Sequence, residues 1–367
     1  MTPGNPIDQL IERRVQWLTD ATGDANIVSS TRVRLARNIV GFPFPGRADE
    51  SQRRQILARV TDAILTTVEM RGCIAVEMTA LSELDRLFLL ERHLISRELC
   101  NDAPGAAAFI ASTETTSIMV NEEDHLRLQI IVPGLQVRRA WEAADCVDNC
   151  LGRRLEYAYS DELGFLTSCP SNIGTGIRAS AMVHLPALAL SEQMDAVNNG
   201  MRQVGFTIRG LYGEGTESLG NLFQISNQST LGENENYIIV KLERLIKRII
   251  EHEKNARQCL LERHPTKLLD YVSRAYGALR HAYILDTKEA INSLSALRLG
   301  IDIGTLTSVD VPMINELLVT IQAAHLQKRA GRMLNGSDRD SMRAELVRKR
   351  LRGTNAEGSQ SSRGPSR

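Results

Sequence analysis

Two arginines share one face of an expected β-strand near the start of the chain. In SSTRVRLAR (29–37), Arg32 and Arg34 fall on one side and Val33 and Leu35 on the other, because successive residues of a strand point to opposite faces. Neighbouring guanidinium groups repel each other unless solvent or an anion separates them. An exposed basic edge strand explains this segment alone, and an anion-binding strand is the alternative.

Three further arginines occupy similar positions. Arg127 lies on the polar face of HLRLQIIV (125–132), Arg178 heads RASAMVH, and Arg209 ends FTIR before a glycine-rich loop. Each alone is typical of a solvated charge, and GEGTE lacks the GK[ST] ending of a P-loop. Together, five arginines on strands or strand ends favour a polyanion. A nucleoside triphosphate fits, because guanidinium groups bind phosphate oxygens bidentately and spread charge over a transferring group.

Three carboxylate side chains directly precede the expected strand that carries Arg127. In NEEDHLRLQ (121–129), Glu122, Glu123 and Asp124 come just before Arg127. A solvated hairpin tip explains the turn but leaves the arginine behind it unexplained. Glu122 and Asp124 are expected to shape the turn.

The segments that must position these residues change in type along the chain. A short helix is expected over 6–19, then strands mixed with helices over 49–71, 79–99 and 237–262. After about residue 256 only helical patterns remain, over 265–283, 287–298, 311–330 and 338–352. The expected fold is α+β: a catalytic domain with a central antiparallel β-sheet flanked by helices, then a smaller all-helical C-terminal domain. The expected divisions are a helical lead-in (1–26), the catalytic domain (27–256), the helical domain (257–352) and a disordered Gly/Ser-rich tail (353–367).

Composition narrows the classes of partner. The chain has 367 residues, with 44 basic and 44 acidic residues, so a general nucleic-acid or anionic-membrane partner is not indicated. The N-terminus lacks the apolar core of a signal peptide, and no apolar run reaches transmembrane length. A cytoplasmic location with reduced thiols is expected. Cys146 and Cys150 have helical spacing and few nearby ligands, so buried structural thiols are favoured over a zinc site.

Four blocks of sequence resemble the ATP:guanido phosphotransferases, in that family's order. They are STRVRLAR (30–37), NEEDHLR (121–127), CPSNIGTGIRAS (169–180) and RGLYGEGTE (209–217). The resemblance spans about residues 27–256. The blocks RASAMVHLPAL and LLERHLIS are similar to the bacterial protein-arginine kinase branch, and RDSMRA (339–344) is similar to its phosphoarginine-binding motif.

The resemblance implies roles for individual residues. Glu123, Glu214 and Cys169 are implied as catalytic. The implied ATP-binding residues are Ser30, Thr31, Arg32, Val33, Arg34, His93, Arg127, Arg178, Ala179, Ser180, Ala181, Met182, Arg209, Gly210, Leu211, Tyr212, Gly213 and Glu214. An allosteric phosphoarginine pocket is implied at Arg339, Asp340, Ser341, Met342, Arg343 and Ala344. Met182 stands where the small-molecule kinases usually carry histidine, so different contacts to the base are expected here.

The implied chemistry is phosphoryl transfer to a guanidinium group. A guanidinium stays protonated in water, so Glu123 is expected to act as base, with Glu214 as a second clamp and a Cys169 thiolate as a third anionic contact. No Asp/Glu cluster resembles a dedicated metal cage, so Mg²⁺ is expected to arrive with ATP.

The position of the first arginine block in the chain bears on the class of substrate. STRVR begins at residue 30, which leaves no room for the helical domain that precedes the catalytic domain in the small-molecule kinases. A kinase acting on exposed arginines of proteins is therefore expected, in stress response and degradation. The resemblance further implies a homodimer, an activator protein and Clp-type protease machinery. A kinase for free arginine or another guanidino compound is the enzymatic alternative, and an inactive phosphoarginine-binding module is the other.

Overall fold

The computed structural model describes residues 5–18, 26–101, 103–211 and 218–357, with side chains described as far as residue 352. The chain forms two compact units. The sheet unit comprises Met1–Val183, Val197–Ile208 and Gln224–Arg248. The helical unit comprises His184–Ala196, Arg209–Phe223 and Ile249–Arg367. Tyr212, Gly213 and Glu214 lie outside the described residues.

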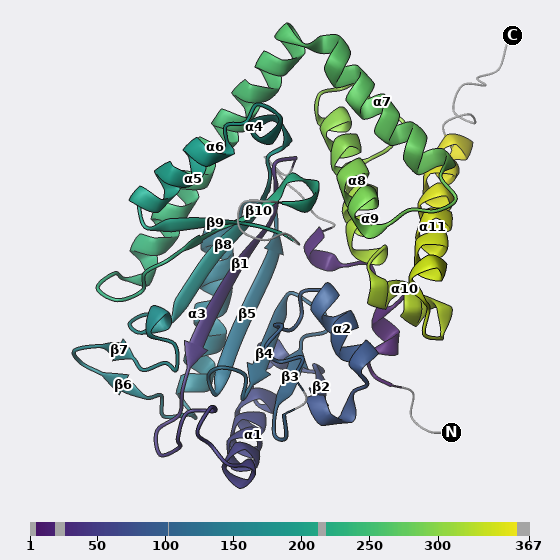
Figure 1. Ribbon diagram of the computed structural model, residues 1–367. Coiled ribbons are helices and arrows are strands. Elements are labelled where there is room, and N and C mark those ends of the chain that lie inside the picture. The colour runs from purple at the N-terminus through teal and green to yellow at the C-terminus, as the bar shows by residue number, and fades with distance from the viewer. Residues whose placement is uncertain (1–4, 19–25, 102, 212–217, 358–367) are drawn as a thin grey trace, which may run out of the picture. The chain divides into compact units, whose positions relative to one another are not determined.

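An eight-stranded sheet has the order β2-β3-β4-β5-β1-β8-β10-β9 (Figure 1). Its strands are β1 (Val28–Arg37), β2 (Ile74–Glu77), β3 (Ala107–Ile110), β4 (Thr116–Val120), β5 (Leu126–Pro133), β8 (Ile177–His184), β9 (Phe206–Gly210) and β10 (Leu222–Asn227). β1 pairs antiparallel with both β5 and β8. A separate hairpin joins β6 (Tyr159–Ser160) to β7 (Gly164–Phe165).

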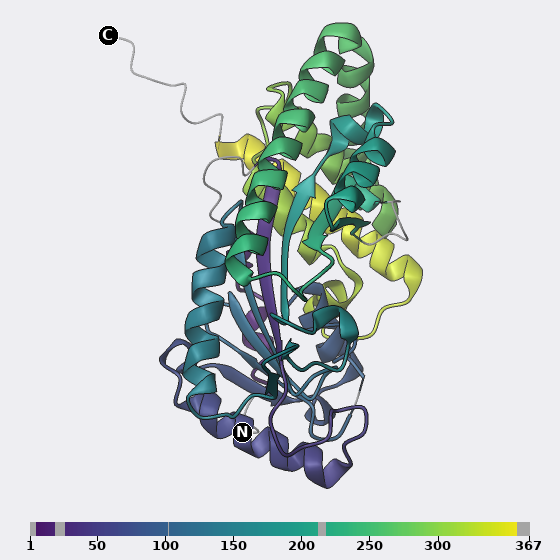
Figure 2. The same ribbon diagram turned by 90° about the vertical axis from the view of Figure 1, so that its left-hand side faces the viewer.

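Helix α3 (Val137–Gly152) packs against β1 and β5 and covers one face of the sheet (Figure 2). Thr31 shows which face this is. Its hydroxyl donates to the carbonyl of Gly134 at 2.7 Å and accepts from the backbone N–H of Gln136 at 3.1 Å, directly before α3. Helices α1 (Glu50–Leu65) and α2 (Glu83–Glu91) also belong to the sheet unit, as does most of α5 (Met194–Gln203). The short 3-10 turns η3 (Val68–Met70) and η4 (Met78–Ala80) lie between α1 and α2, while η5 (Pro170–Asn172) precedes β8.

The expected helix over 6–19 is wrong. The structure has two 3-10 turns there, η1 (Asp8–Leu10) and η2 (Gln16–Leu18). Trp17 and Leu18 are buried, and η2 packs on β5, so tertiary contacts override the local helical pattern.

The C-terminal region is helical, and the expected α+β class is confirmed. Its elements are α6 (Glu235–Arg263), α7 (Pro265–His281), α8 (Thr287–Asp302), α9 (Val311–Thr320), α10 (Ala323–Ala330) and α11 (Gly336–Glu357). The short helix α4 (Pro186–Leu190) and the turn η6 (Leu219–Asn221) complete the helical elements. A core that includes Leu279, Leu294, Ile314 and Val347 joins α7, α8, α9 and α11.

Candidate active site

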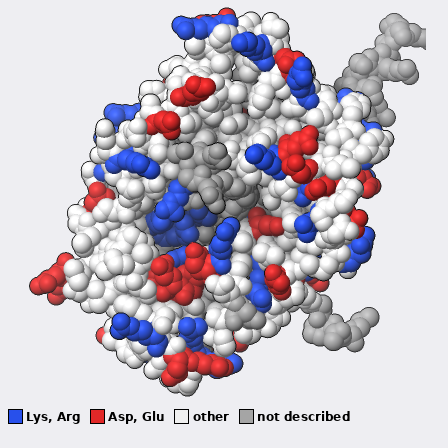
Figure 3. Space-filling view, viewed as in Figure 1, with Lys and Arg blue, Asp and Glu red and all other residues white. Residues whose placement is uncertain are grey.

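Four arginines lie on one face of the sheet. Arg34 of β1 is directly opposite Arg178 of β8, Arg32 is opposite Ser180, and Arg127 of β5 is opposite Ala36. Directly paired residues of antiparallel strands point to the same side, so Arg32, Arg34, Arg127 and Arg178 share what we call the arginine face. This face is the one opposite α3. Figure 3 shows Lys and Arg side chains in a hollow of this surface, with Asp and Glu side chains beside them.

Only alternate residues of the two central strands reach the arginine face. Val33, Ala179 and Ala181 have no exposed surface and point toward the α3 side, as Thr31 does. Ser30 is paired with Met182 on the arginine side, and both are buried. A side-chain contact with a ligand is therefore open to the arginines and their neighbours, whereas Thr31, Val33, Ala179 and Ala181 shape the strands.

The guanidinium groups of the arginine face repel one another. Burial, then Arg178 and Arg127, lower the pKa of Arg32 to about 10. Burial, then Arg32, Arg127 and Arg178, lower the pKa of Arg34 well below its ordinary value. Two of the hydrogen-bond partners are neutral: Arg32 donates to Gln224 at 2.6 Å, and Arg178 to the Ser226 hydroxyl at 3.2 Å.

A buried donor on this face has no partner. The Nε of Arg34 makes no hydrogen bond to any described residue. An unpaired buried N–H is costly unless a ligand supplies an acceptor. The donor set and the repulsion within it fit a polyphosphate, whose oxygens accept from several guanidinium groups at once.

Two carboxylates of the acidic turn (121–125) form ion pairs with Arg127, the fourth arginine of this face. Arg127 Nη1 is 2.6 Å from Glu122, and its Nη2 is 2.6 Å from Glu123. The Glu122 side chain is fully buried and accepts from the Ser96 hydroxyl at 2.5 Å, while 38% of the Glu123 side chain is exposed. Burial raises the pKa of Glu122, although Arg127 opposes that shift. Of the two adjacent carboxylates, Glu123 is the one that solvent or a substrate can reach.

Asp124 and His125, the next two residues of the turn, are held by hydrogen bonds to other segments. Asp124 is fully buried, and its Oδ1 accepts from the Asn38 side chain and from the Ser168 backbone N–H, each at 2.7 Å. His125 Nδ1 accepts from the Ile39 N–H at 2.9 Å. Asp124 thereby joins the turn to the residue before Cys169, a link that no spacing in the sequence reveals.

Cys169 lies in the loop ahead of β8. Its Sγ is 3.0 Å from the Ser171 hydroxyl, and its carbonyl accepts from the Thr167 hydroxyl at 2.8 Å. The thiol is half-buried. The loop thus presents the thiol on the sheet unit that also holds the acidic turn.

The remaining predicted site residues are spread over both units. His93 has φ 60°, and its ring meets Trp17 edge-on at 5.2 Å between centroids. Arg209 is exposed near the end of β9, which Gly210 completes, and the Leu211 N–H donates to the Leu222 carbonyl at 2.8 Å.

The segment 339–344 forms part of α11. Arg343 is buried and donates to the carbonyls of Ile321 and Leu285, at 3.0 and 2.7 Å, and to Asp340 at 2.5 Å. Arg339 is half-buried and donates to the Leu334 carbonyl at 3.2 Å. Ala344 is buried, whereas Ser341 is exposed and Met342 half-buried. The two arginines therefore differ: Arg343 binds backbone inside the unit, and Arg339 lies nearer its surface.

Comparison with known proteins decides the family. Residues 55–256 match the ATP:guanido phosphotransferase C-terminal catalytic domain, and residues 265–362 match the protein-arginine kinase McsB C-terminal domain. A protein-arginine kinase of Halothermothrix orenii is 44% identical over 338 residues, which cover 91% of this chain and 96% of that protein. The chain belongs to the protein-arginine kinase branch of the ATP:guanido phosphotransferase family. It is a kinase.

Other relatives agree. A protein-arginine kinase of Brevibacillus brevis is 43% identical and covers 92% of this chain and 95% of its own length. Among solved structures, the duplicated taurocyamine kinase of Schistosoma mansoni is 27% identical with a TM-score of 0.58, over 67% of this chain and 35% of that chain. Lombricine kinase is 23% identical with a TM-score of 0.55, over 69% of this chain and 71% of that chain, and supports the fold alone. Within the residues described, no helix is long and apolar enough to cross a membrane.

Proposed function

We propose that the protein transfers the γ-phosphoryl group of ATP to arginine side chains of proteins. The observation that carries the proposal is the arginine face with Glu123 at its edge. A polyphosphate on this face would lie beside a carboxylate able to receive a guanidinium group. The similarity to protein-arginine kinases over nearly the whole chain supports a protein as the acceptor.

ATP phosphates bind to Arg32, Arg34, Arg127 and Arg178 in this proposal, and the resemblance adds Arg209. Their positive charge lowers the energy of the transition state, in which negative charge spreads over the transferring group. His93 lies near the base. Mg²⁺ enters with ATP and is held mainly by its phosphates.

Glu123 acts as base toward the acceptor. It removes a proton from a guanidinium nitrogen, that nitrogen forms a bond to the γ-phosphorus, and the bond to the bridging oxygen of ADP breaks. Glu123 contacts Arg127 at 2.6 Å in this structure. Phosphates that draw Arg127 away would release Glu123 for the substrate guanidinium, so nucleotide binding prepares the base. Glu214 and Cys169 are proposed as the second and third anionic contacts.

The helical unit is proposed to bind phosphoarginine and to couple modified protein to kinase activity. Arg339 would contact the phosphoryl group and Asp340 the guanidinium. Arg343 supports the pocket from inside, since its guanidinium is bonded to the backbone at Ile321 and Leu285. A homodimer, an activator protein, Clp-type protease partners and a role in stress response in the cytoplasm remain predictions from the resemblance.

The test is phosphoarginine formation on a defined acceptor. The kinase is incubated with ATP, Mg²⁺, free arginine and a model protein, and a second sample holds the same model protein with every arginine replaced by lysine. Mass spectrometry under non-acidic conditions should find phosphoarginine in the first protein and none in the second. Phosphate found only on free arginine would establish the small-molecule alternative instead.

A further inference from the structure

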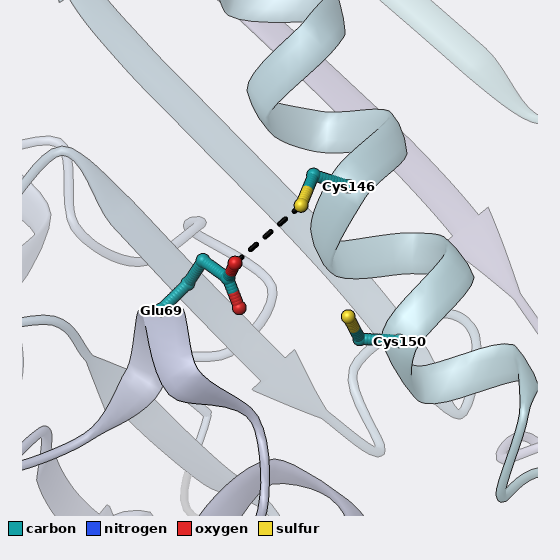
Figure 4. Close-up of side chains that lie close together, drawn as sticks. All are labelled: Glu69, Cys146 and Cys150. Atoms are coloured by element: carbon teal, nitrogen blue, oxygen red, sulfur yellow. Dashed lines mark hydrogen bonds between the residues drawn. The ribbon is translucent and has the colours of Figure 1, made fainter.

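Two thiols and a carboxylate from separate elements meet beside α3. Cys146 and Cys150 are four residues apart on this helix and so project from one side of it. Glu69 comes from η3, 77 residues before Cys146. The Sγ of Cys146 is 3.4 Å from a Glu69 carboxylate oxygen, and one ligand atom of each residue lies within 4.8 Å of the others. Figure 4 shows the three side chains pointing toward one another.

The cluster is open to solvent. Glu69 and Cys146 are exposed, and Cys150 is half-buried. The expectation of buried structural thiols is therefore wrong for Cys146, and the expected lack of nearby ligands failed because Glu69 is distant in sequence. An exposed thiol side chain is not needed to fill the core beneath α3, where Ala140, Ala144 and Val147 already pack.

The spacing suits a tetrahedral thiophilic cation. Zinc bonds of about 2.3 Å to sulfur and about 2.1 Å to oxygen place neighbouring ligand atoms about 3.6 to 3.8 Å apart. The distance of 3.4 Å between Cys146 and Glu69 is close to that value. Bringing the Cys150 sulfur into place needs a movement of at most about 1 Å, which side-chain rotation supplies.

We propose that Cys146, Cys150 and Glu69 bind one divalent thiophilic cation of the zinc class. Both thiols lose their protons on binding, and water occupies the fourth position. Soft thiolate ligands favour such ions over Mg²⁺, so this site is distinct from the metal that accompanies ATP. The bound ion ties η3 to α3, the helix that supports β1 and β5 from the side opposite the arginine face.

The test titrates the full-length, reduced and chelator-treated protein with Cd²⁺, whose bonds to thiolates absorb in the ultraviolet. One equivalent should bind, and excess Mg²⁺ should not displace it. Cys146→Ser and Cys150→Ser should each remove the absorption, and Glu69→Gln should weaken binding about tenfold. Matched controls are Cys259→Ser, an exposed thiol elsewhere, and Glu142→Gln, one helical turn before Cys146; neither should change binding.

Alkylation gives a second readout that does not depend on kinase activity. Stoichiometric Zn²⁺ should slow the reaction of Cys146 and Cys150 with iodoacetamide while leaving Cys259 as reactive as before, measured by peptide mass spectrometry. Unchanged Cd²⁺ binding in the Cys146→Ser/Cys150→Ser double variant, or equal protection of Cys259, would overturn the site. The contact between Cys146 and Glu69 would then be a thiol–carboxylate hydrogen bond only.

Discussion

Adjacent carboxylates in the acidic turn have different surroundings. Glu122 is enclosed and bonded to both Arg127 and Ser96, whereas Glu123 bonds to Arg127 from a partly exposed position. Both glutamates therefore contact Arg127, but only Glu123 is also open to a substrate.

Substitution should separate these two contributions. Glu123→Gln should lower kcat by about 10³-fold, because the base is lost, with little change in the free energy of unfolding. Glu122→Gln should lower the free energy of unfolding by about 3 kcal/mol, because a buried ion pair is broken. Phosphoarginine kinetics and urea denaturation measure the two effects, and equal destabilisation by both variants would contradict the distinction.

Sequence alone predicted part of this residue-level arrangement. The two-residue period of a strand was enough to place Arg32 with Arg34, and Arg127 opposite the apolar face, because that period follows from backbone geometry. It could not show that Asp124 holds Ser168 or that Glu69 meets Cys146, because those contacts join residues tens of positions apart and leave no local pattern.

Among the elements, helix α11 carries two arginines of one motif in different surroundings, one buried and one nearer the surface. Arg343 donates to two backbone carbonyls that lie outside the helices. One is that of Leu285, between α7 and α8, and the other is that of Ile321, directly after α9. Sequence spacing put Arg339 and Arg343 on one helix face, but it could not show that one of them is buried. That outcome depends on which loops pack on the helix.

Loss of the buried arginine should therefore loosen the packing of α11. Arg343→Met should lower the free energy of unfolding by about 3 kcal/mol, because two carbonyls and Asp340 lose a donor. Arg339→Ala should change it by less than about 1 kcal/mol, since Arg339 is nearer the surface. Chemical denaturation compares them, and a larger loss in Arg339→Ala would refute the assignment. Arg339→Ala is thus the cleaner variant for a phosphoarginine-binding assay.

At the scale of the whole molecule, each unit encloses charged or titratable side chains of its own. The sheet unit encloses the pair Arg92–Glu114, with 2.7 Å between the charged atoms. The helical unit encloses Arg257, which bonds to Glu253 at 2.7 Å and to Asp302 at 2.9 Å. His184 is also buried in the helical unit and lies 2.8 Å from the Ser295 hydroxyl.

Acid should destabilise the protein through His184. Burial, then Arg298 and Arg257, hold the pKa of His184 well below its ordinary value of 6.5. As the pH falls below that value, the unfolded chain takes up a proton that the folded protein does not, so stability present above it is progressively lost.

The measurement is a difference between two proteins. Between about pH 7.5 and about pH 5.5, wild type should lose about 1 kcal/mol more than His184→Gln in urea denaturation. The comparison removes the contribution of Glu253 and Asp302, whose pKa values are raised by burial and which act in the opposite direction. Identical pH dependence in both proteins would exclude His184 as the cause.

The domain boundary near residue 256 remains a prediction from sequence. It rests on the change to helical periodicity, which is a local pattern. The placement of 184–196 and 209–223 with the helical unit leaves no such pattern, since it depends on contacts such as the one between the Gly220 N–H and Asn292 at 2.9 Å.

The crowding of guanidinium groups on β1, β5 and β8 also affects how long the enzyme survives. Burial and neighbouring guanidinium groups lower the pKa of both Arg32 and Arg34, so the crowding of these charges disfavours the folded chain when no anion is bound. A nucleotide that binds only the folded form relieves this repulsion and favours folding by mass action. The lifetime of the native kinase should thus follow nucleotide supply, and an energy-starved cell would hold less of it.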